Sequence, residues 1–102
     1  MDADLVLVEL KGAVDSNVRN LLDISVSLRP RLNEIKGRLT ELGEAPKEGD
    51  PAEAPEITDE RSRLNAERMQ INALTGQAED LSIRGTTLSN LITDTRRQLF
   101  TN

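Results

Sequence analysis

Carboxylates, hydroxyls and lysines are the side chains that could do chemistry here, because the chain contains neither His nor Cys. That composition excludes thiol nucleophiles, disulfides, imidazole catalysis and the usual zinc sites. The adjacent acids Glu79 and Asp80 would point about 100° apart on a helix, so they cannot share one substrate atom. Four nearby hydroxyls have no His or Lys placed to activate them, namely Ser82, Thr86, Thr87 and Ser89.

Other acidic positions do not indicate an enzyme either. Asp2 and Asp4 lie at the terminus, and no glycine loop that binds phosphate is present. Glu48, Asp50 and Glu53 could attract calcium, but the calcium-loop spacing with its central Gly and terminal Glu is missing. The sequence therefore predicts a noncatalytic protein with no catalytic residue, no cofactor and no metal.

The net charge of −5 is unevenly distributed. From Glu44 to Glu60 there are seven acids and one base, so this segment carries −6 and the remainder about +1. No basic face that would bind nucleic acid is visible, and we expect no such partner. Phe100 is the one aromatic residue, which is typical of long helices and coiled coils with aliphatic cores.

An apolar seven-residue repeat runs through both halves of the chain and provides the elements that position these groups. Such a repeat keeps one seam of a helix facing a partner helix. The two halves are in mirror register, so that Leu42 meets Ile57 and Leu7 meets Ile92. We predict an all-α fold, a long antiparallel helical hairpin resembling a coiled coil. Its predicted seam residues are Leu7, Val14, Leu21, Leu28, Ile35, Leu42, Ile57, Leu64, Ile71, Ala78, Leu81, Leu88 and Ile92.

Turn-forming residues set the predicted boundaries. We expect one domain over 1–102, with a helix over 3–42, an acidic connector over 43–55 and a second helix over 56–99. Three Pro and two Gly residues exclude regular structure from the connector. At 13 residues it is long for a helical hairpin, so we expect it to be exposed.

Two positions could disturb the helices. Pro30 removes the hydrogen bond to the Val26 carbonyl, while the repeat passes through it unchanged. We predict a kink with Pro30 as the hinge; two separate helices meeting there are the alternative. Gly85 faces Val14 across the seam, where it allows close approach of the helices or leaves room for a third.

Charged residues outside the seam are expected to pair within each helix. Arg63 with Glu67 and Glu34 with Arg38 are four residues apart, a spacing that stabilises helices. Arg61 is expected on the outer surface beside Arg63.

More apolar residues are present than one seam can hide, and they gather toward the two chain ends. This favours a partner there: a second copy completing a four-helix bundle, another helix of a longer chain, or a membrane-proximal neighbour. Alternatively, single exposed Leu and Val residues are common and need no partner. The residues are Leu5, Val6, Val8, Leu10, Leu22, Ile24, Val26, Ile83, Leu91 and Phe100.

No stretch reaches the ~18 consecutive apolar residues of a membrane helix. The acidic start is unlike a secretory signal. The chain is therefore either a cytosolic protein or a fragment from which a targeting segment has been removed.

Several strings resemble the N-terminal domain of unknown function that precedes the membrane part of certain bacterial MscS-type mechanosensitive channels. The most specific are Leu28-Arg29-Pro30-Arg31-Leu32 and, after Leu42-Gly43, Ala54-Pro55-Glu56-Ile57. The resemblance covers roughly residues 8 to 100. Further matching strings are Arg38-Leu39-Thr40-Glu41, Glu60-Arg61, Leu64-Asn65-Ala66-Glu67-Arg68, Ile71-Asn72-Ala73-Leu74, Ala78-Glu79-Asp80-Leu81-Ser82-Ile83-Arg84 and Arg96-Arg97-Gln98-Leu99-Phe100.

The resemblance implies a periplasmic location, a homo-oligomeric channel and membrane helices elsewhere in the full-length protein, through which the hairpin is tied to the inner membrane. The family has no settled activity for this domain, so no functional residue is carried over. The expected function is a noncatalytic extramembrane module that mediates subunit contacts or modulates gating. The alternative is a cytosolic coiled-coil adaptor or chaperone-like hairpin that homodimerises.

Overall fold

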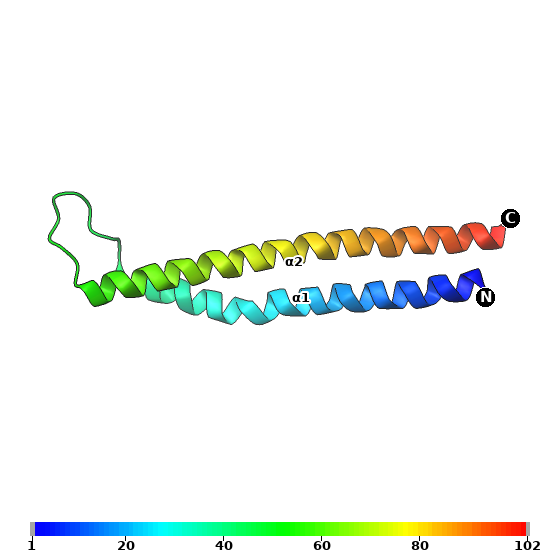
Figure 1. Cartoon of the computed structure of the whole chain (residues 1–102), viewed down its shortest axis with the longest axis horizontal. Helices are drawn as coiled ribbons and strands as arrows, with labels where there is room; N and C mark the ends of the chain where they lie inside the picture. The colour runs from blue at the N-terminus through cyan, green and yellow to red at the C-terminus, as the bar shows by residue number, and fades with distance from the viewer. Residues whose placement is uncertain (1, 102) are drawn as a thin grey trace.

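Two long helices form the protein. The computed structural model describes residues 2–101, which contain α1 (Ala3–Leu42) and α2 (Pro55–Thr101) and no strand. The helices run antiparallel and side by side, with both termini at one end and the connector at the other (Figure 1). The molecule measures 76 × 21 × 18 Å. The predicted all-α helical hairpin is confirmed.

Asp2 and Gly43 cap the two ends of α1. The Asp2 side chain accepts a hydrogen bond from the Asp4 N–H at 3.0 Å, which satisfies a free donor of the first turn. Gly43 follows the last helical residue with φ of 72°, and its N–H donates to the Thr40 carbonyl at 3.1 Å. Glycine adopts that left-handed conformation at little cost, so the helix ends there.

The connector is shorter than expected by one residue. α2 begins at Pro55, whose fixed φ suits the first helical position, and it continues to Thr101 instead of ending at residue 99. Residues 43–54 hold a turn in which Lys47 and Asp50 exchange hydrogen bonds, with Gly49 at φ of 91°.

α1 is continuous through Pro30, so the alternative of two separate helices is wrong. The ribbon of α1 bends in its cyan part, the region around residue 30 (Figure 1). Val26 is 58% exposed, so water can reach the carbonyl that lost its partner. The Ser25 and Ser27 hydroxyls donate to the carbonyls of Leu21 and Ile24, contacts that also bend helices.

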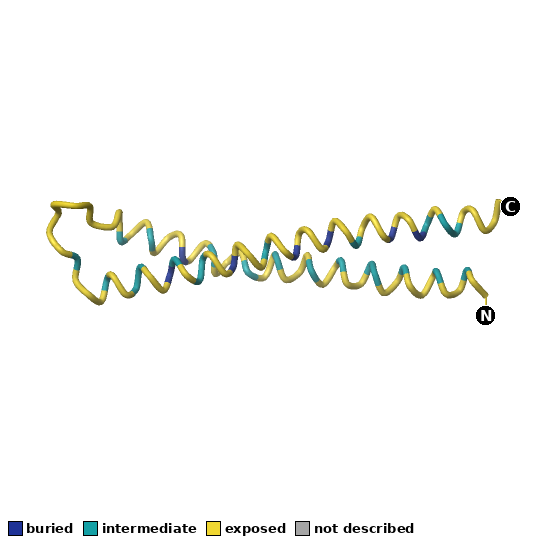
Figure 2. The backbone as a smooth tube through the Cα atoms, turned by 45° about the horizontal axis from the view of Figure 1, so that its top comes forward, coloured by how far each residue is buried: buried dark blue, intermediate teal, exposed yellow. Residues whose placement is uncertain are grey.

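The core is a narrow line between the helices (Figure 2). It is densest toward the connector, where Ile35, Leu64 and Ile71 are buried and Leu28 and Leu42 pack against them. Farther along α2, Ala78 and Ile92 are also buried. The remaining predicted seam positions are half-buried, apart from two discussed below; they are Leu7, Val14, Leu21 and Ile57.

Candidate functional site

Toward the chain ends, one of the two α2 rows that face α1 is polar. Ser82 and Ser89 are each 6% exposed, whereas Leu81 and Leu88 are 48% and 43% exposed. Leu81 and Leu88 therefore do not lie inside the seam, which corrects the sequence prediction. The leucine row (Leu81 and Leu88) and the serine row (Ser82 and Ser89) lie on opposite sides of the seam position Gly85. The serine row is the one that faces α1.

Small side chains explain this choice. A Cβ atom added to Gly85 would lie 2.5 Å from Cγ2 of Val18 and 3.9 Å from Cγ1 of Val14. The backbone of α2 therefore approaches the side chains of α1 too closely for any larger residue at this position. Ser82 and Ser89 fit such an approach and leucines would not, so α2 turns its leucines outward.

The outward leucines are part of an apolar strip on one face of the hairpin. The strip includes a row of α1 that lies beside them and is interrupted by the exposed Asn17. Each member is between 43% and 52% exposed. The apolar strip consists of Leu10, Ile24, Leu74, Leu81 and Leu88.

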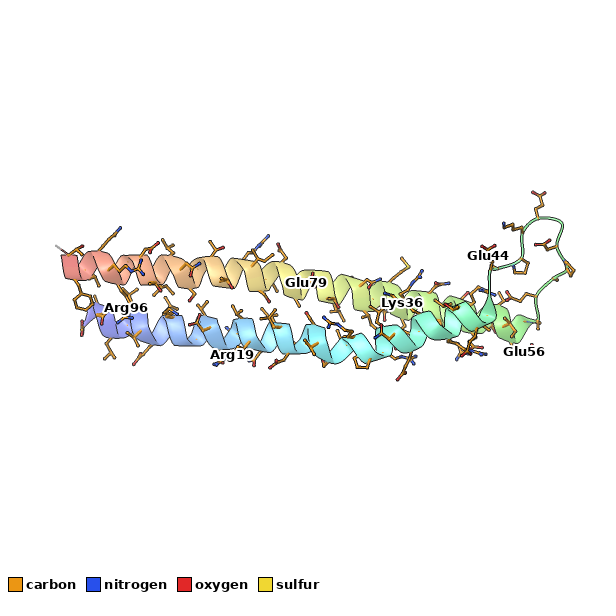
Figure 3. All side chains as sticks on the ribbon, turned by 180° about the vertical axis from the view of Figure 1, so that it is seen from behind. Arg19, Lys36, Glu44, Glu56, Glu79 and Arg96 are labelled. Atoms are coloured by element: carbon orange, nitrogen blue, oxygen red, sulfur yellow. The ribbon has the colours of Figure 1, made fainter. Side chains whose placement is uncertain are left out.

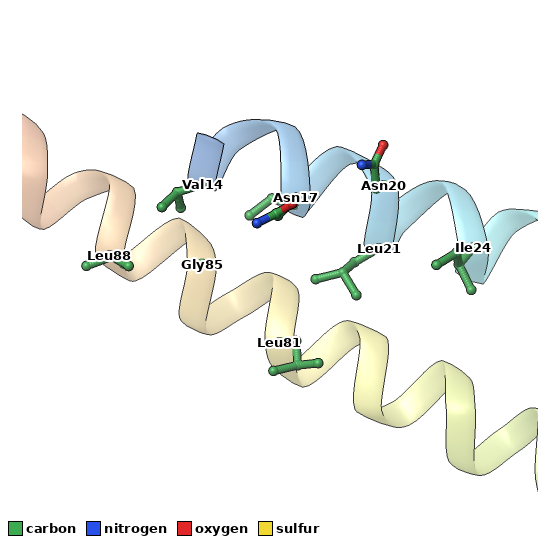
Figure 4. Close-up of a pocket in the computed structure, with 9 residues that line it drawn as sticks. Val14, Asn17, Asn20, Leu21, Ile24, Leu81, Gly85 and Leu88 are labelled. Atoms are coloured by element: carbon green, nitrogen blue, oxygen red, sulfur yellow. The ribbon is translucent and has the colours of Figure 1, made fainter. Parts of the chain in front are cut away.

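An open groove of about 420 Å³ runs along this strip. Leu81 and Leu88 border it on the α2 side, Leu21 and Ile24 on the α1 side, and Gly85 lies between them (Figure 4). Its lining is largely aliphatic, and its polar groups are amides such as that of Asn17. A groove of this kind accepts apolar side chains from another surface and offers no general acid, base or nucleophile.

The same face carries charges toward the connector. Arg31 Nη2 contacts Glu67 Oε2 at 2.7 Å, and Arg38 Nε contacts Glu60 Oε1 at 2.5 Å. We call these two pairs the Arg–Glu ladder. Hydrogen bonds from Arg31 and Arg38 hold the pKa of Glu67 and Glu60 below the usual range of glutamate. The ladder links the two helices.

The ladder replaces the pairs expected from the sequence. Glu67 bonds across the hairpin to Arg31 instead of to Arg63, and Arg38 bonds to Glu60 and to Glu41 instead of to Glu34. A guanidinium can grip a carboxylate with two parallel N–H groups, and both cross-hairpin pairs have this geometry.

A second polar cluster closes the chain-end side of the seam. Arg96 Nε contacts Asp4 Oδ1 at 2.7 Å, at the end of the rod seen in Figure 3. The Ser89 hydroxyl donates to Asp15 Oδ1 at 2.6 Å, and Lys11 contacts the other Asp15 oxygen at 2.7 Å. The Lys11 and Ser89 hydrogen bonds lower the pKa of Asp15, which makes this carboxylate a poor general base.

Arg61 ties the connector to α1. Its Nη1 donates to the Gly43 carbonyl at 2.6 Å and its Nη2 contacts Glu53 Oε1, also at 2.6 Å. The side chains of Arg61 and Glu53 are 13% and 15% exposed, so the expectation that Arg61 lies on the outer surface is wrong. The carbonyls at the end of α1 need donors, and Arg61 supplies them.

The candidate chemical groups are used structurally or face solvent. The Ser82 hydroxyl donates to the Ala78 carbonyl at 2.7 Å, and Asp80 contacts Arg84 at 3.2 Å. Glu79 and Thr86 border a second open groove on the other flank. Among residues 2–101, no three acidic side chains come together as metal ligands would.

Comparison with protein-family models found no match for this chain. Comparisons with the curated proteins and with the solved structures found no significant match either. Neither helix has a segment apolar and long enough to span a bilayer, within the residues that the structure describes. The resemblance to the channel domain therefore rests on the sequence strings themselves.

Proposed function

We propose that this chain is a noncatalytic helical module that works through its exposed apolar surface. Fifteen large hydrophobic residues within 2–101 are exposed, whereas five hydrophobic residues are buried. This imbalance is the observation that carries the proposal, because a monomeric soluble protein rarely leaves so much apolar surface without a use. The hydrogen bonds and ion pairs described above join residues of the hairpin to one another, so the exposed apolar surface is what remains to contact partners.

The strings shared with MscS-type channels support a more specific role. In it, the hairpin is the periplasmic, membrane-proximal module of such a channel, and it mediates subunit contacts or restricts movement of the pore domain under tension. Both ends of the chain lie at the same end of the rod, which supports this role (Figure 1). The apolar residues Leu99 and Phe100 lie at that end, 47% and 72% exposed, where α2 would lead toward a membrane helix.

The coding sequence around this chain tests the channel role. A secretory signal upstream and segments of 18 or more apolar residues downstream of residue 102 are expected. In the full-length protein, deletion of the hairpin should change the membrane tension at which single-channel currents open in a patch. A reading frame that stops directly after residue 102 would contradict the channel role.

The second candidate is a cytosolic adaptor or chaperone-like hairpin that homodimerises. The same exposed leucines favour it, because paired hairpins bury such rows in a four-helix bundle. It predicts a stop codon at the end of this chain and a dimer that needs no membrane segment.

A further inference from the structure

The hairpin exposes more surface than a folded chain of its size normally does. Its accessible surface is 7621 Å². A compact monomer of 11.3 kDa exposes about 5,700 Å², which leaves a surplus of about 1,900 Å² here. Each partner in an obligate dimer buries roughly 1,000 to 2,500 Å². The surplus therefore matches one partner's share of a stable interface.

The apolar rows are also too wide for two helices. A two-stranded coiled coil uses two adjacent rows per helix, whereas a bundle helix uses a third. In α2 the central row of Ile71, Ala78 and Ile92 is buried and the next row, with Leu81 and Leu88, is exposed. That third row has the spacing of a helix that packs against two neighbours at once.

We propose that the apolar strip and the Arg–Glu ladder form one interface for a second copy of this chain. The two hairpins lie parallel, with their connectors at the same end, and are related by a two-fold axis along the rod. Each α1 then lies against the partner's α2, and four helices enclose the strips of both copies. The inference rests on the proposed function as a module for subunit contacts, and it names the partner and the face.

Charge favours this orientation. The strip and the ladder occupy one face, and their levels are spaced seven residues apart along each helix. In the parallel arrangement, Arg31 of one copy faces the partner's Glu67 and Glu67 faces the partner's Arg31. Opposite charges therefore meet at the ladder, and leucines meet leucines or Ile24 at most strip levels.

An antiparallel pair would lose these contacts. If the two strips of an antiparallel pair were aligned at their middle, the level of Leu81, then Arg31 would lie at the level of Ala3 and Thr95 of the partner. The Arg38 level would extend beyond the end of the other rod. Such a pair overlaps over a shorter length and does not bring Glu67 or Glu60 of the partner to either arginine.

Asn17 fits the parallel pair as a register marker. It interrupts the strip between Leu10 and Ile24, at the level of Leu81. In the four-helix layer the two Asn17 amides lie diagonally across the interior, where they can bond each other. A shift by one level would set one amide diagonally opposite Leu10 and the other opposite Ile24, which costs the amide–amide hydrogen bonds and so favours the unshifted alignment.

Sedimentation equilibrium and pulsed spin-label distances test the proposal directly. The chain has no Cys, so Ala52→Cys places one label in the connector. We expect twice the chain mass of 11.3 kDa and a label-to-label distance comparable to the 21 Å width. A distance approaching the 76 Å length would overturn the parallel arrangement, and a monomer over the whole loading range would overturn the shared interface.

A matched pair of substitutions locates the interface. Leu81→Gln lies on the strip, and Ile83→Gln, two residues on, lies at the groove of the other flank with 67% exposure. Leu81→Gln should weaken dimerisation about 30-fold, because the half-buried leucine is lost twice per dimer. Ile83→Gln should leave it unchanged, and both variants should keep their helical circular dichroism. Equal effects of the two variants would overturn the assignment of the face.

These results are separable from the proposed function. A parallel dimer combined with a reading frame ending at residue 102 would reject the channel role and keep the interface. A monomer combined with downstream membrane helices would reject the interface and keep the channel role.

Discussion

The close approach at Gly85 can be measured by adding one methyl group. Glycine inside a helix is about 1 kcal/mol less favourable than alanine, so Gly→Ala normally stabilises. At Gly76, also in α2, an added Cβ meets nothing within 4 Å. Gly76→Ala should therefore raise the free energy of unfolding by about 1 kcal/mol, which raises the melting temperature by about 4 to 8 °C in a domain of this size.

Gly85→Ala should behave oppositely. The new Cβ would lie 2.5 Å from Cγ2 of Val18, against ordinary contacts of 3.4 Å or more, and the branched Val18 side chain has one strongly preferred rotamer in a helix. The helices must separate, and overpacking of this kind costs about 1 to 3 kcal/mol. The propensity gain offsets part of this cost, so the net change should lie between zero and a loss of about 2 kcal/mol.

Thermal unfolding followed by helical circular dichroism, at one fixed chain concentration, measures both changes. Val18→Ala removes the methyl group that clashes, so Gly85→Ala should recover its gain of about 1 kcal/mol in that background. An equal rise in melting temperature for Gly76→Ala and Gly85→Ala in the unsubstituted chain would refute the close approach. It would also remove the reason why the serines, and not the leucines, face α1.

Three further outcomes follow from the polar contacts and the bend. Arg61→Ala should lower the melting temperature clearly more than Arg63→Ala, since the first removes donors from the end of α1 and leaves Glu53 unpaired. The lowered pKa of the two ladder glutamates stabilises the fold fully above their ordinary pKa of about 4.3. That stability is lost as the pH falls toward the folded-state values, so the acid side of a melting-temperature profile should flatten in the Glu60→Gln, Glu67→Gln double variant. Pro30→Ala restores the backbone hydrogen bond to the Val26 carbonyl and should raise the melting temperature. It should also straighten α1, so that the distance between two spin labels placed on either side of the bend lengthens; an unchanged distance would contradict Pro30 as the hinge.

The heptad repeat was sufficient to predict the rods, their antiparallel order and their register, because it is a property of the sequence alone. It could not decide which row beside the seam turns inward. Leu81 and Ser82 lie on opposite sides of the same seam row, and hydrophobicity favours the leucine. The outcome depends on how closely α2 approaches Val18, a tertiary contact that no local pattern contains.

The ion pairs between the two helices could have been predicted from the sequence. Arg31 and Arg38 are seven residues apart, as are Glu60 and Glu67, and the predicted register places them opposite each other. Pairing within a helix competes with pairing between helices, and the bidentate cross-hairpin geometry prevails. Arg61 gave no comparable signal, because its partners are the Gly43 carbonyl, whose position depends on where α1 ends, and Glu53 in the irregular connector.

The arrangement of rows bears on why this hairpin needs a partner. A pair of helices can hide about two rows each; in α2 one of these rows contains Ser82 and Ser89, and the other contains Gly85. Turning Leu81 and Leu88 inward instead would bury more apolar area but would force the helices apart at Val18. The sequence keeps these leucines on a row where they contribute little to the isolated hairpin. Their burial yields its full hydrophobic gain only when another surface covers the groove, so on this reasoning the stability of the hairpin and its association are linked, and the melting temperature should rise with chain concentration.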